Sequence, residues 1–323
     1  MADWPSASWE LLRQSGALGW SVPKEYGGTE RSPVEILRGS EQIANACAAV
    51  AFALSQRESA IRRLLSGPQV LKSRYLPRVA TGEIFVTVGF SQLSTSRQHT
   101  GPSLHAEGTS DGYILNGELP WVTGADQAEG IVAGATLADG RQLLALLPKS
   151  QAGVEISQPM ALSALLGSRT SVIHCRDVRL EEADVISGPM ERVLGPIGGG
   201  GLETSCVALG LTEAAIESLR VHAEKRPQFR PLFEKFEGRH REARRRLHKL
   251  AAAPSDPEAI LSLRVACTRL VLNSTQANLL AAKGTGFVEP HEAQHWARQA
   301  LFFLVWSSPP AVVEGMMRDF LDD

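Results

Sequence analysis

Two histidines near the C-terminal end of the chain have the spacing of a metal site. The segment His291-Glu292-Ala293-Gln294-His295 satisfies the His-Glu-x-x-His pattern on an expected helix, which puts both imidazoles on one face. In that arrangement the two imidazoles hold Zn²⁺ and the glutamate acts as general base in hydrolysis. The spacing alone therefore allows a zinc hydrolase.

The run over residues 112–125 has the residue types of a hairpin that ends in a Trp-x-Thr strand. Asn116-Gly117 favours a two-residue turn, because both residues tolerate positive φ. The alternating Tyr, Leu, Trp and Thr around it suit a half-buried sheet. Taken alone, the pattern also fits an ordinary surface hairpin.

The same run resembles the flavin-binding signature of the acyl-CoA dehydrogenase family. That signature reads Tyr-x-Leu-Asn-Gly-x-Lys-x-Trp-Ile-Thr-Asn-Gly, and this chain departs from it with Leu119 in place of the lysine and Gly124-Ala125 in place of the final Asn-Gly. The resemblance implies FAD as cofactor. It implies that Trp121 packs beside the isoalloxazine ring and that the Thr123 hydroxyl forms a hydrogen bond with the reactive edge of that ring.

Shorter motifs follow in the order in which the family has them. They are a Val-Pro and Tyr-Gly-Gly turn over 20–28, Gly82-Glu83 before the flavin loop, Gly167-Ser168-x-Thr170 at a strand entry, and Asp177-Val178-Arg179 at a strand exit. The resemblance thus covers nearly the whole chain. It argues against zinc, because His291 and His295 fall on a helix that already has a role in the family, and we expect no metal.

Two further motifs resemble the part of the family that approaches the phosphates and the adenosine of the cofactor. Arg226 and Phe229 resemble the Glu-Arg-x-x-Phe-Gly motif, whose arginine reaches the FAD pyrophosphate of a neighbouring subunit. A guanidinium fork suits phosphate oxygens, although Arg226 also fits a solvated charge at a helix end. Gly284 and Gly286 match part of a Gln-x-x-Gly-Gly-x-Gly turn, and any helix-ending Gly-x-Gly would look the same.

The loop that contacts flavin in the family retains little of its pattern here. Ser91 falls where the family has the threonine of Thr-Glu-Pro and keeps a hydroxyl. Residues 92–96 have lost the Glu-Pro and the Ala-Gly-Ser-Asp that follow in the family. The resemblance therefore implies a flavin contact at Ser91 and leaves the rest of the loop without an assigned role.

Oxidation of a thioester by a flavin needs a hydride acceptor and a carboxylate that removes the proton from Cα. When the chain is aligned from Arg298, the position of the family's glutamate holds Ser307, whose proton is far less acidic than that of a carboxylic acid. Some family members place the glutamate on the first helix of the C-terminal bundle, and Glu203 lies about one helical turn beyond that position. Glu203 is our candidate catalytic base. It also fits a first-turn carboxylate that complements the helix dipole.

Segments of three kinds carry these residues. Apolar residues recur at helical spacing over 8–66, short β-type runs between turn residues fill 84–186, and helical spacing returns beyond 198. We therefore expect an α+β fold of acyl-CoA dehydrogenase type. It has an N-terminal helical domain over 1–83, a central small β-barrel or sandwich domain over 84–187, and a C-terminal helical bundle over 188–323.

Composition limits the partners and the compartment. The chain has 323 residues, 43% of them hydrophobic, and a formal net charge of −2, which offers no field that favours nucleic acid or an anionic membrane. Its 4 cysteines are far apart and fit a reducing compartment. The start lacks a leader pattern and no apolar run spans a bilayer, so we expect a cytoplasmic protein. The basic run over 241–249 fits a solvated helix face or a subunit contact.

The resemblance implies a FAD-dependent oxidoreductase that carries out α,β-dehydrogenation of an acyl-CoA or acyl-carrier thioester. Electrons would pass to an electron-transfer flavoprotein or a similar acceptor. The protein would be a homo- or hetero-oligomer, because the family completes its FAD site across an interface. Two alternatives stay open: a flavin-dependent monooxygenase of the same fold, which needs no thioester base, and a non-catalytic subunit that pairs with an active paralogue.

Overall fold

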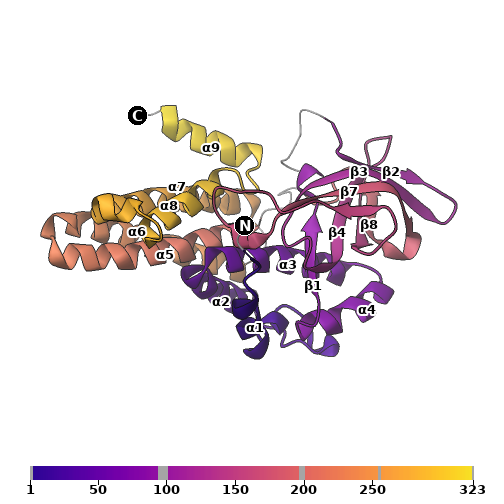
Figure 1. Ribbon diagram of the computed structural model, residues 1–323, viewed down its shortest axis with the longest axis horizontal. Helices are drawn as coiled ribbons and strands as arrows, with labels where there is room; N and C mark the ends of the chain where they lie inside the picture. The colour runs from indigo at the N-terminus through magenta and orange to yellow at the C-terminus, as the bar shows by residue number, and fades with distance from the viewer. Residues whose placement is uncertain (1–2, 94–100, 196–200, 254–255, 322–323) are drawn as a thin grey trace. The chain divides into compact units, whose positions relative to one another are not determined.

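The computed structural model of the chain describes residues 3–93, 101–195, 201–253 and 256–321 (Figure 1). Its helices are α1 (Ser6–Gln14), α2 (Pro33–Ala46), α3 (Ala48–Ser66), α4 (Gln69–Ala80), α5 (Leu202–Lys225), α6 (Arg230–Ala252), α7 (Pro257–Ala282), α8 (Glu292–Leu301) and α9 (Pro310–Leu321). Its strands are β1 (Phe85–Gly89), β2 (Leu104–Gly108), β3 (Gly112–Val122), β4 (Ala128–Thr136), β5 (Gln142–Pro148), β6 (Val154–Ile156), β7 (Ser171–Glu181) and β8 (Val185–Met190). N-terminal helices, a central sheet and a C-terminal helical bundle confirm the expected α+β fold. Within the described ranges, none of the helices combines the length and the apolar character that crossing a bilayer requires.

The chain forms two compact units, which we name the sheet unit and the helical unit. The sheet unit comprises Met1–Ser32, Ala53–Ala161 and Leu166–Gly199, and the helical unit comprises Pro33–Phe52, Leu162–Leu165 and Gly200–Asp323. The helical unit thus takes α2 from the N-terminal part of the chain. The domain ranges 1–83, 84–187 and 188–323 follow chain order instead and remain a prediction.

The sheet unit is built on one sheet with the strand order β6-β7-β3-β2-β4-β5-β8, and β1 pairs with β4 in parallel. The strand β3 pairs antiparallel with β7 from Gly112↔Glu181 to Val122↔Ser171. Leu115, Leu119 and Val122 on β3 are fully buried. These three side chains belong to one core cluster of the sheet unit.

Asn116 and Gly117 lie in the middle of β3, so the hairpin turn expected at these residues is wrong. The strand continues through them, and its register with β7 shifts between Leu115 and Gly117, as at a β-bulge. Gly117 has a φ of 123°, and a Cβ there would lie 2.2 Å from the carbonyl oxygen of Ser103. Asn116 accepts a hydrogen bond of 2.8 Å from the backbone N–H of Asp177 on β7. The positive-φ signal of Asn-Gly is thus used by a bulge and not by a turn.

A buried arginine ties the helices of the sheet unit together. Arg57 on α3 is 0% exposed and donates hydrogen bonds of 2.6 Å to the carbonyl oxygens of Leu18 and Val79. Its Nη1 lies 3.0 Å from the carboxylate of Glu58. Burial lowers the pKa of Arg57, and the Glu58 charge opposes that shift. The arginine therefore links α3 to α4 through Val79, and to the segment after α1 through Leu18.

In the helical unit, α5 packs against α2, α6 and α7, and α7 packs against α8 (Figure 1). The helix α5 approaches α2 closely at Gly210, where a Cβ would lie 2.4 Å from the carbonyl oxygen of Glu41 and 2.5 Å from the Cβ of Ala44. Glycine therefore sets the spacing between these two helices. Beside this close approach, polar side chains of α2 and α6 contact one another.

Candidate active site

Trp121 is the second-to-last residue of β3, Thr123 directly follows the strand, and the two side chains differ sharply in exposure. The Trp121 side chain is 49% exposed, whereas Thr123 is 2% exposed. The Oγ1 of Thr123 lies 3.4 Å from the Oγ1 of Thr170, which lies 2.9 Å from the Oγ of Ser168. Three buried hydroxyls therefore form a row, and its first member, Thr123, is two residues from the exposed indole ring. We name Thr123, Thr170 and Ser168 the hydroxyl row.

The turn after Thr123 holds the hydroxyl row in place. Gly124 has a φ of 61°, and a Cβ there would lie 2.7 Å from the Phe85 ring. Its backbone N–H donates a 2.8 Å hydrogen bond to the carbonyl oxygen of Ser168. The glycine thus fixes the strand entry at Ser168 beside the end of β3.

Ser91 is carried by a short 3₁₀ helix, η3 (Ser91–Leu93), that follows β1. This helix contacts both β3 and β4, and Gln92 donates a 2.6 Å hydrogen bond to the carbonyl oxygen of Gly134. The sheet unit therefore places the half-buried Ser91 on a segment that touches the strand of Trp121 and Thr123. Residues 94–96 of the expected flavin loop lie outside the described residues.

Arg226 ends α5 in the helical unit and is anchored by its neighbours. Its Nη2 donates a 2.5 Å hydrogen bond to the carbonyl oxygen of Ala281 and lies 2.8 Å from the Nδ1 of His222. Its guanidinium carbon lies 4.7 Å from the centre of the Phe229 ring, a stacking arrangement that favours a cation. Among the described residues, the other two guanidinium nitrogens make no hydrogen bond. The side chain is thus fixed at one nitrogen and keeps donors on the others.

Gly284 and Gly286 lie in η7 (Lys283–Phe287), directly after the helix end that Arg226 holds. A Cβ on Gly286 would lie 2.5 Å from the Cβ of Ala282, so the turn requires glycine there. No atom lies within 4 Å of a Cβ built on Gly284. The structure therefore brings the Arg226 motif and the glycine turn to the same end of the helical unit.

Glu203 lies in the first turn of α5, and Ser307 lies on the loop before α9. A Cβ on Gly201 would lie 2.6 Å from the Oε2 of Glu203, so the carboxylate folds back over the start of the helix. Ser307 has a φ of 47°. The neighbour of Glu203, Thr204, lines the same hollow as Ser307. The two positions considered for a base thus meet in one region of the helical unit.

Arg264 on α7 is a residue of this hollow that sequence reasoning missed. It is 4% exposed, and its Nη2 donates hydrogen bonds of 2.7 Å to the carbonyl oxygen of Trp306 and 3.3 Å to that of Phe303. Burial lowers the pKa of Arg264 to about 9. An available signal was the arginine between apolar Leu263 and Val265 on an apolar helix, since an arginine is rarely buried without a reason.

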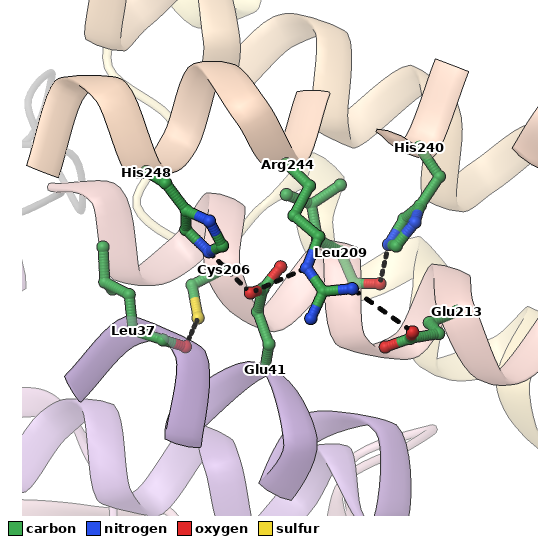
Figure 2. A network of polar contacts seen from close by, with 8 residues as sticks. All are labelled: Leu37, Glu41, Cys206, Leu209, Glu213, His240, Arg244 and His248. Carbon is green, nitrogen blue, oxygen red and sulfur yellow. Dashed lines mark hydrogen bonds and ion pairs between the residues drawn. The ribbon is translucent and has the colours of Figure 1, made fainter. Parts of the chain in front are cut away.

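A second polar cluster lies between α2, α5 and α6 (Figure 2). Glu41 on α2 is 1% exposed, and its Oε2 lies 3.3 Å from the Nε of Arg244 and 3.0 Å from the Nε2 of His248 on α6. Arg244 also lies 3.5 Å from Glu213 on α5. His240 bonds the carbonyl oxygen of Leu209 at 3.1 Å, and burial lowers its pKa. Arg244, which belongs to the basic run over 241–249, thus makes contacts within the helical unit. The cluster links α2, α5 and α6.

The zinc pattern at His291 and His295 serves the helix α8 itself. The Nδ1 of His291 accepts a hydrogen bond of 3.1 Å from the backbone N–H of Ala293, which caps the helix, and the Nε2 of His295 lies 2.9 Å from Gln299. Burial lowers the pKa of His295. In the part of the chain that the structure describes, no group of histidine, cysteine and carboxylate side chains could hold a metal ion.

Comparison with known proteins shows similarity to one family. The family model described as acyl-CoA dehydrogenase, N-terminal domain, matches residues 1–83. The probable acyl-CoA dehydrogenase YngJ of Bacillus subtilis (strain 168) is 24% identical over 237 residues, which are 70% of this chain and 62% of the relative. These matches support membership of the acyl-CoA dehydrogenase family. The chain spans about three fifths of the length of that relative.

Solved structures show the same fold at low identity. A glutaryl-CoA dehydrogenase from Mycobacterium smegmatis, in complex with FADH2, matches with a TM-score of 0.87 at 17% identity over 99% of this chain and 88% of the other. Dibenzothiophene monooxygenase TdsC from Paenibacillus sp. A11-2 matches with a TM-score of 0.81 at 18% identity over 98% of this chain and 89% of the other. Dehydrogenases and a monooxygenase thus share this architecture.

Proposed function

We propose that the chain is a FAD-dependent oxidoreductase that acts on the CH–CH bond of an acyl thioester and passes electrons to an electron-transfer flavoprotein or a similar acceptor. The observation that carries the proposal is the pairing of an exposed Trp121 ring with the buried hydroxyl of Thr123 at the end of β3. An indole ring that is 49% exposed offers a flat apolar face, and a nearby hydroxyl can donate a hydrogen bond to a heteroatom of a flat ring.

The residues present fit a bound FAD at both of its ends. Trp121, Thr123 and Ser91 would contact the flavin ring, and Arg226 with Phe229 would hold the pyrophosphate of a cofactor in a neighbouring subunit. The guanidinium supports this assignment, because two of its nitrogens keep donors for phosphate oxygens. A bound flavin would supply the acceptor for a hydride. The protein would then be an oligomer.

The turn that carries Gly284 and Gly286 would lie against the adenosine end of the same cofactor. The required glycine at position 286 makes the chain compact there, because a Cβ would meet Ala282 at 2.5 Å. A backbone without side chains can approach a ligand closely. The support for this role is the hydrogen bond from Arg226 to the carbonyl oxygen of Ala281, which places the glycine turn beside the Arg226 side chain.

The proposed base for the Cα proton is Glu203. A carboxylate can accept that proton near neutral pH, whereas the hydroxyl of Ser307 cannot do so comparably. The carboxylate folds over Gly201 at the start of α5.

A second candidate function follows from the serine at position 307. A monooxygenase or a non-catalytic partner subunit needs no carboxylate there, and the hollow beside Ser307 is lined by an arginine and a threonine. The monooxygenase TdsC shares this fold at 18% identity. This candidate predicts a protein whose flavin, if bound, stays oxidised in the presence of any acyl-CoA.

The test is the absorption spectrum of the purified protein before and after anaerobic addition of a panel of acyl-CoA thioesters. Bleaching of a flavin band supports dehydrogenation, and Glu203→Gln should then abolish bleaching while leaving the band in place. A band that stays oxidised with every thioester contradicts dehydrogenation and favours the monooxygenase, which is checked by oxygen consumption with reduced flavin. Absence of a flavin band contradicts the proposal and favours the non-catalytic subunit.

A further inference from the structure

The helix α6 carries a row of cationic side chains on the face opposite its core contacts. Its buried residues are Phe236, His240, Ala243 and Leu247. Arg241, Arg245 and Lys249 follow one another at four-residue intervals on the other side of the helix, and all three are exposed. The side chains of Arg241 and Arg245 are 69% and 77% exposed. We name Arg241, Arg245 and Lys249 the outer row.

The outer row lies in a segment whose charge differs from that of the whole chain. Residues 239–249 hold six lysines and arginines against one glutamate, whereas the chain has a formal net charge of −2. Among the described residues, Lys249 makes no ion pair, and the two arginines pair with glutamates of the same helix, Glu237 and Glu242. Exposed pairs of this kind contribute little to stability, so carboxylates of another molecule can replace them. The outer row therefore presents positive charge that the chain neutralises only in part.

The neighbouring polar row of α6 has its partners inside the helical unit. His240, Arg244 and His248 each precede a member of the outer row by one residue, and the Nε of Arg244 lies 3.3 Å from the buried carboxylate of Glu41 (Figure 2). One residue turns an α-helix by about 100°, so the outer row points elsewhere. The contacts that explain the inward charges thus leave the outer row unexplained.

Gly238 lies on the same face as the outer row, three residues before Arg241. It is inside a helix of 23 residues, where glycine is less favourable than alanine. Within the described structure, no atom lies within 4 Å of a Cβ built on Gly238, so packing in the chain does not require glycine there. A missing side chain on an open helix face lets the backbone of another molecule approach closely.

The outer face of α6 suits an acidic helix better than a nucleic acid or a membrane. Residues 239–252 include no Phe, Tyr or Trp on which a base could stack. The buried apolar residues of α6 face the core, so the outer row has none of them to insert into a bilayer. Eight residues of helix span about 12 Å, and carboxylates that recur every three or four residues on a second helix match the intervals of the row.

We propose that the outer face of α6 binds an acidic helix of a different protein. The partner helix crosses α6 at Gly238, and its carboxylates contact the guanidinium groups of Arg241 and Arg245 and the ammonium group of Lys249. A second copy of this chain is disfavoured in a contact between two α6 helices, because it would bring an equally basic helix against the outer row. The contact does not involve flavin, so it is independent of the proposed oxidation.

The probes are two labelled alanine-rich peptides of about 20 residues with equal numbers of glutamates. In the face peptide the glutamates recur every three or four residues along one side, and in the scattered peptide they are distributed around the helix. Fluorescence anisotropy with the full chain should show saturable binding of the face peptide, at least about fivefold tighter than that of the scattered peptide. Added sodium chloride should weaken the binding, since the contact is electrostatic.

Substitutions in the outer row test which charges hold the face peptide. Arg241→Gln, Arg245→Gln and Lys249→Gln should each raise its dissociation constant about two- to fivefold. Arg220→Gln is the matched control, because Arg220 is also exposed and pairs with glutamates of its own helix, α5. It removes the same charge and should leave the dissociation constant unchanged. An equal effect of Arg220→Gln would show that binding follows net charge, which overturns the proposal.

Gly238→Gln tests the crossing point with two readouts that move in opposite directions. Glutamine favours a helix more than glycine does, and no atom lies within 4 Å of the added Cβ, so the Tm should rise. The face peptide should bind at least about fivefold more weakly, because the new side chain occupies the crossing point. A higher Tm with unchanged peptide affinity contradicts the crossing at Gly238.

Light scattering of the wild type and of Arg245→Glu distinguishes a different protein from a second copy. We expect the same molar mass for both. A lower mass in Arg245→Glu would assign the outer row to a contact between subunits and overturn the proposal. Absence of saturable binding of the face peptide, or equally tight binding of an oligonucleotide of the same charge, would also overturn it.

Discussion

In the hydroxyl row, the Thr123 side chain is buried, and its hydroxyl can still form a hydrogen bond with a ligand. Thr123 is 2% exposed, yet its hydroxyl is only weakly engaged, since Thr170 lies 3.4 Å away. A hydrogen bond of that length contributes little to folding. Turning the hydroxyl toward a ligand would therefore cost little free energy of folding. We expect the position of the Thr123 hydroxyl to affect ligand binding more than stability.

Thr123→Val tests this division between binding and stability. The change keeps the shape of the side chain and removes one long hydrogen bond, so we expect the free energy of unfolding in urea to fall by about 1 kcal/mol or less. If FAD binds as proposed, its dissociation constant should rise about tenfold, measured by flavin fluorescence. Thr87→Val on β1 is the control, because its hydroxyl is buried without a hydrogen-bond partner in the described structure. Equal flavin affinity in both variants would contradict the assignment of Thr123.

His240 gives a second prediction, on pH. Burial is the largest cause that lowers its pKa below 6.5, so the folded chain favours the neutral imidazole. The unfolded chain then binds more protons below that value. The stabilisation is complete above about pH 6.5 and is lost as the pH falls toward the folded pKa. Chemical denaturation between about pH 7.5 and about pH 5 should show a smaller acid loss in His240→Gln than in wild type. Parallel curves would mean that other groups account for the acid sensitivity.

Among the helices, the contact between α2 and α5 depends on the absence of one methyl group. A Cβ on Gly210 would lie 2.4 Å from the carbonyl oxygen of Glu41 and 2.5 Å from the Cβ of Ala44, both on α2. Neither neighbour is the flexible end of a long side chain, so the helices themselves must move apart. That movement would also strain the cluster of Glu41, Arg244 and His248 between α2 and α6.

Gly210→Ala should therefore destabilise the chain although alanine favours helices. We expect the free energy of unfolding in urea to fall by about 1–3 kcal/mol, the usual cost of overpacking. Gly238→Ala on α6 is the matched control, because no atom lies within 4 Å of its Cβ. That variant should gain about 0.5–1 kcal/mol from helix propensity alone. A gain in both variants would show that α2 is not packed against Gly210 in solution.

Across the whole chain, the sequence was informative about the order of elements and less so about individual geometry. Helical and β-type periodicities gave N-terminal helices, a sheet and a bundle, because each pattern reflects burial of one face. Asn116-Gly117 was misassigned to a turn, since positive φ serves a bulge equally well and only strand pairing distinguishes the two. Arg264 was missed for a similar reason. Its burial depends on carbonyl groups of Phe303 and Trp306, which are some 40 residues away along the chain.

Assembly carries the last prediction, because the proposed cofactor site takes Trp121 from one subunit and Arg226 from its neighbour. Trp121→Ala and Arg226→Gln should each lower the FAD content of the purified protein, measured by absorbance. When the two variants are co-expressed, a mixed pair has one site with both substitutions and one site with neither. The FAD content of the mixture should therefore exceed that of either variant alone.

The rescue distinguishes a shared site from a site within one chain. If both residues served the cofactor of their own chain, every site in the mixture would lack one of them and no rescue would occur. Arg220→Gln is a control for charge, since Arg220 is exposed on α5 and pairs with Glu217 and Glu224. It should leave the FAD content unchanged. A mixture that holds no more FAD than its components would contradict a site built across the interface, even if each variant alone loses the cofactor.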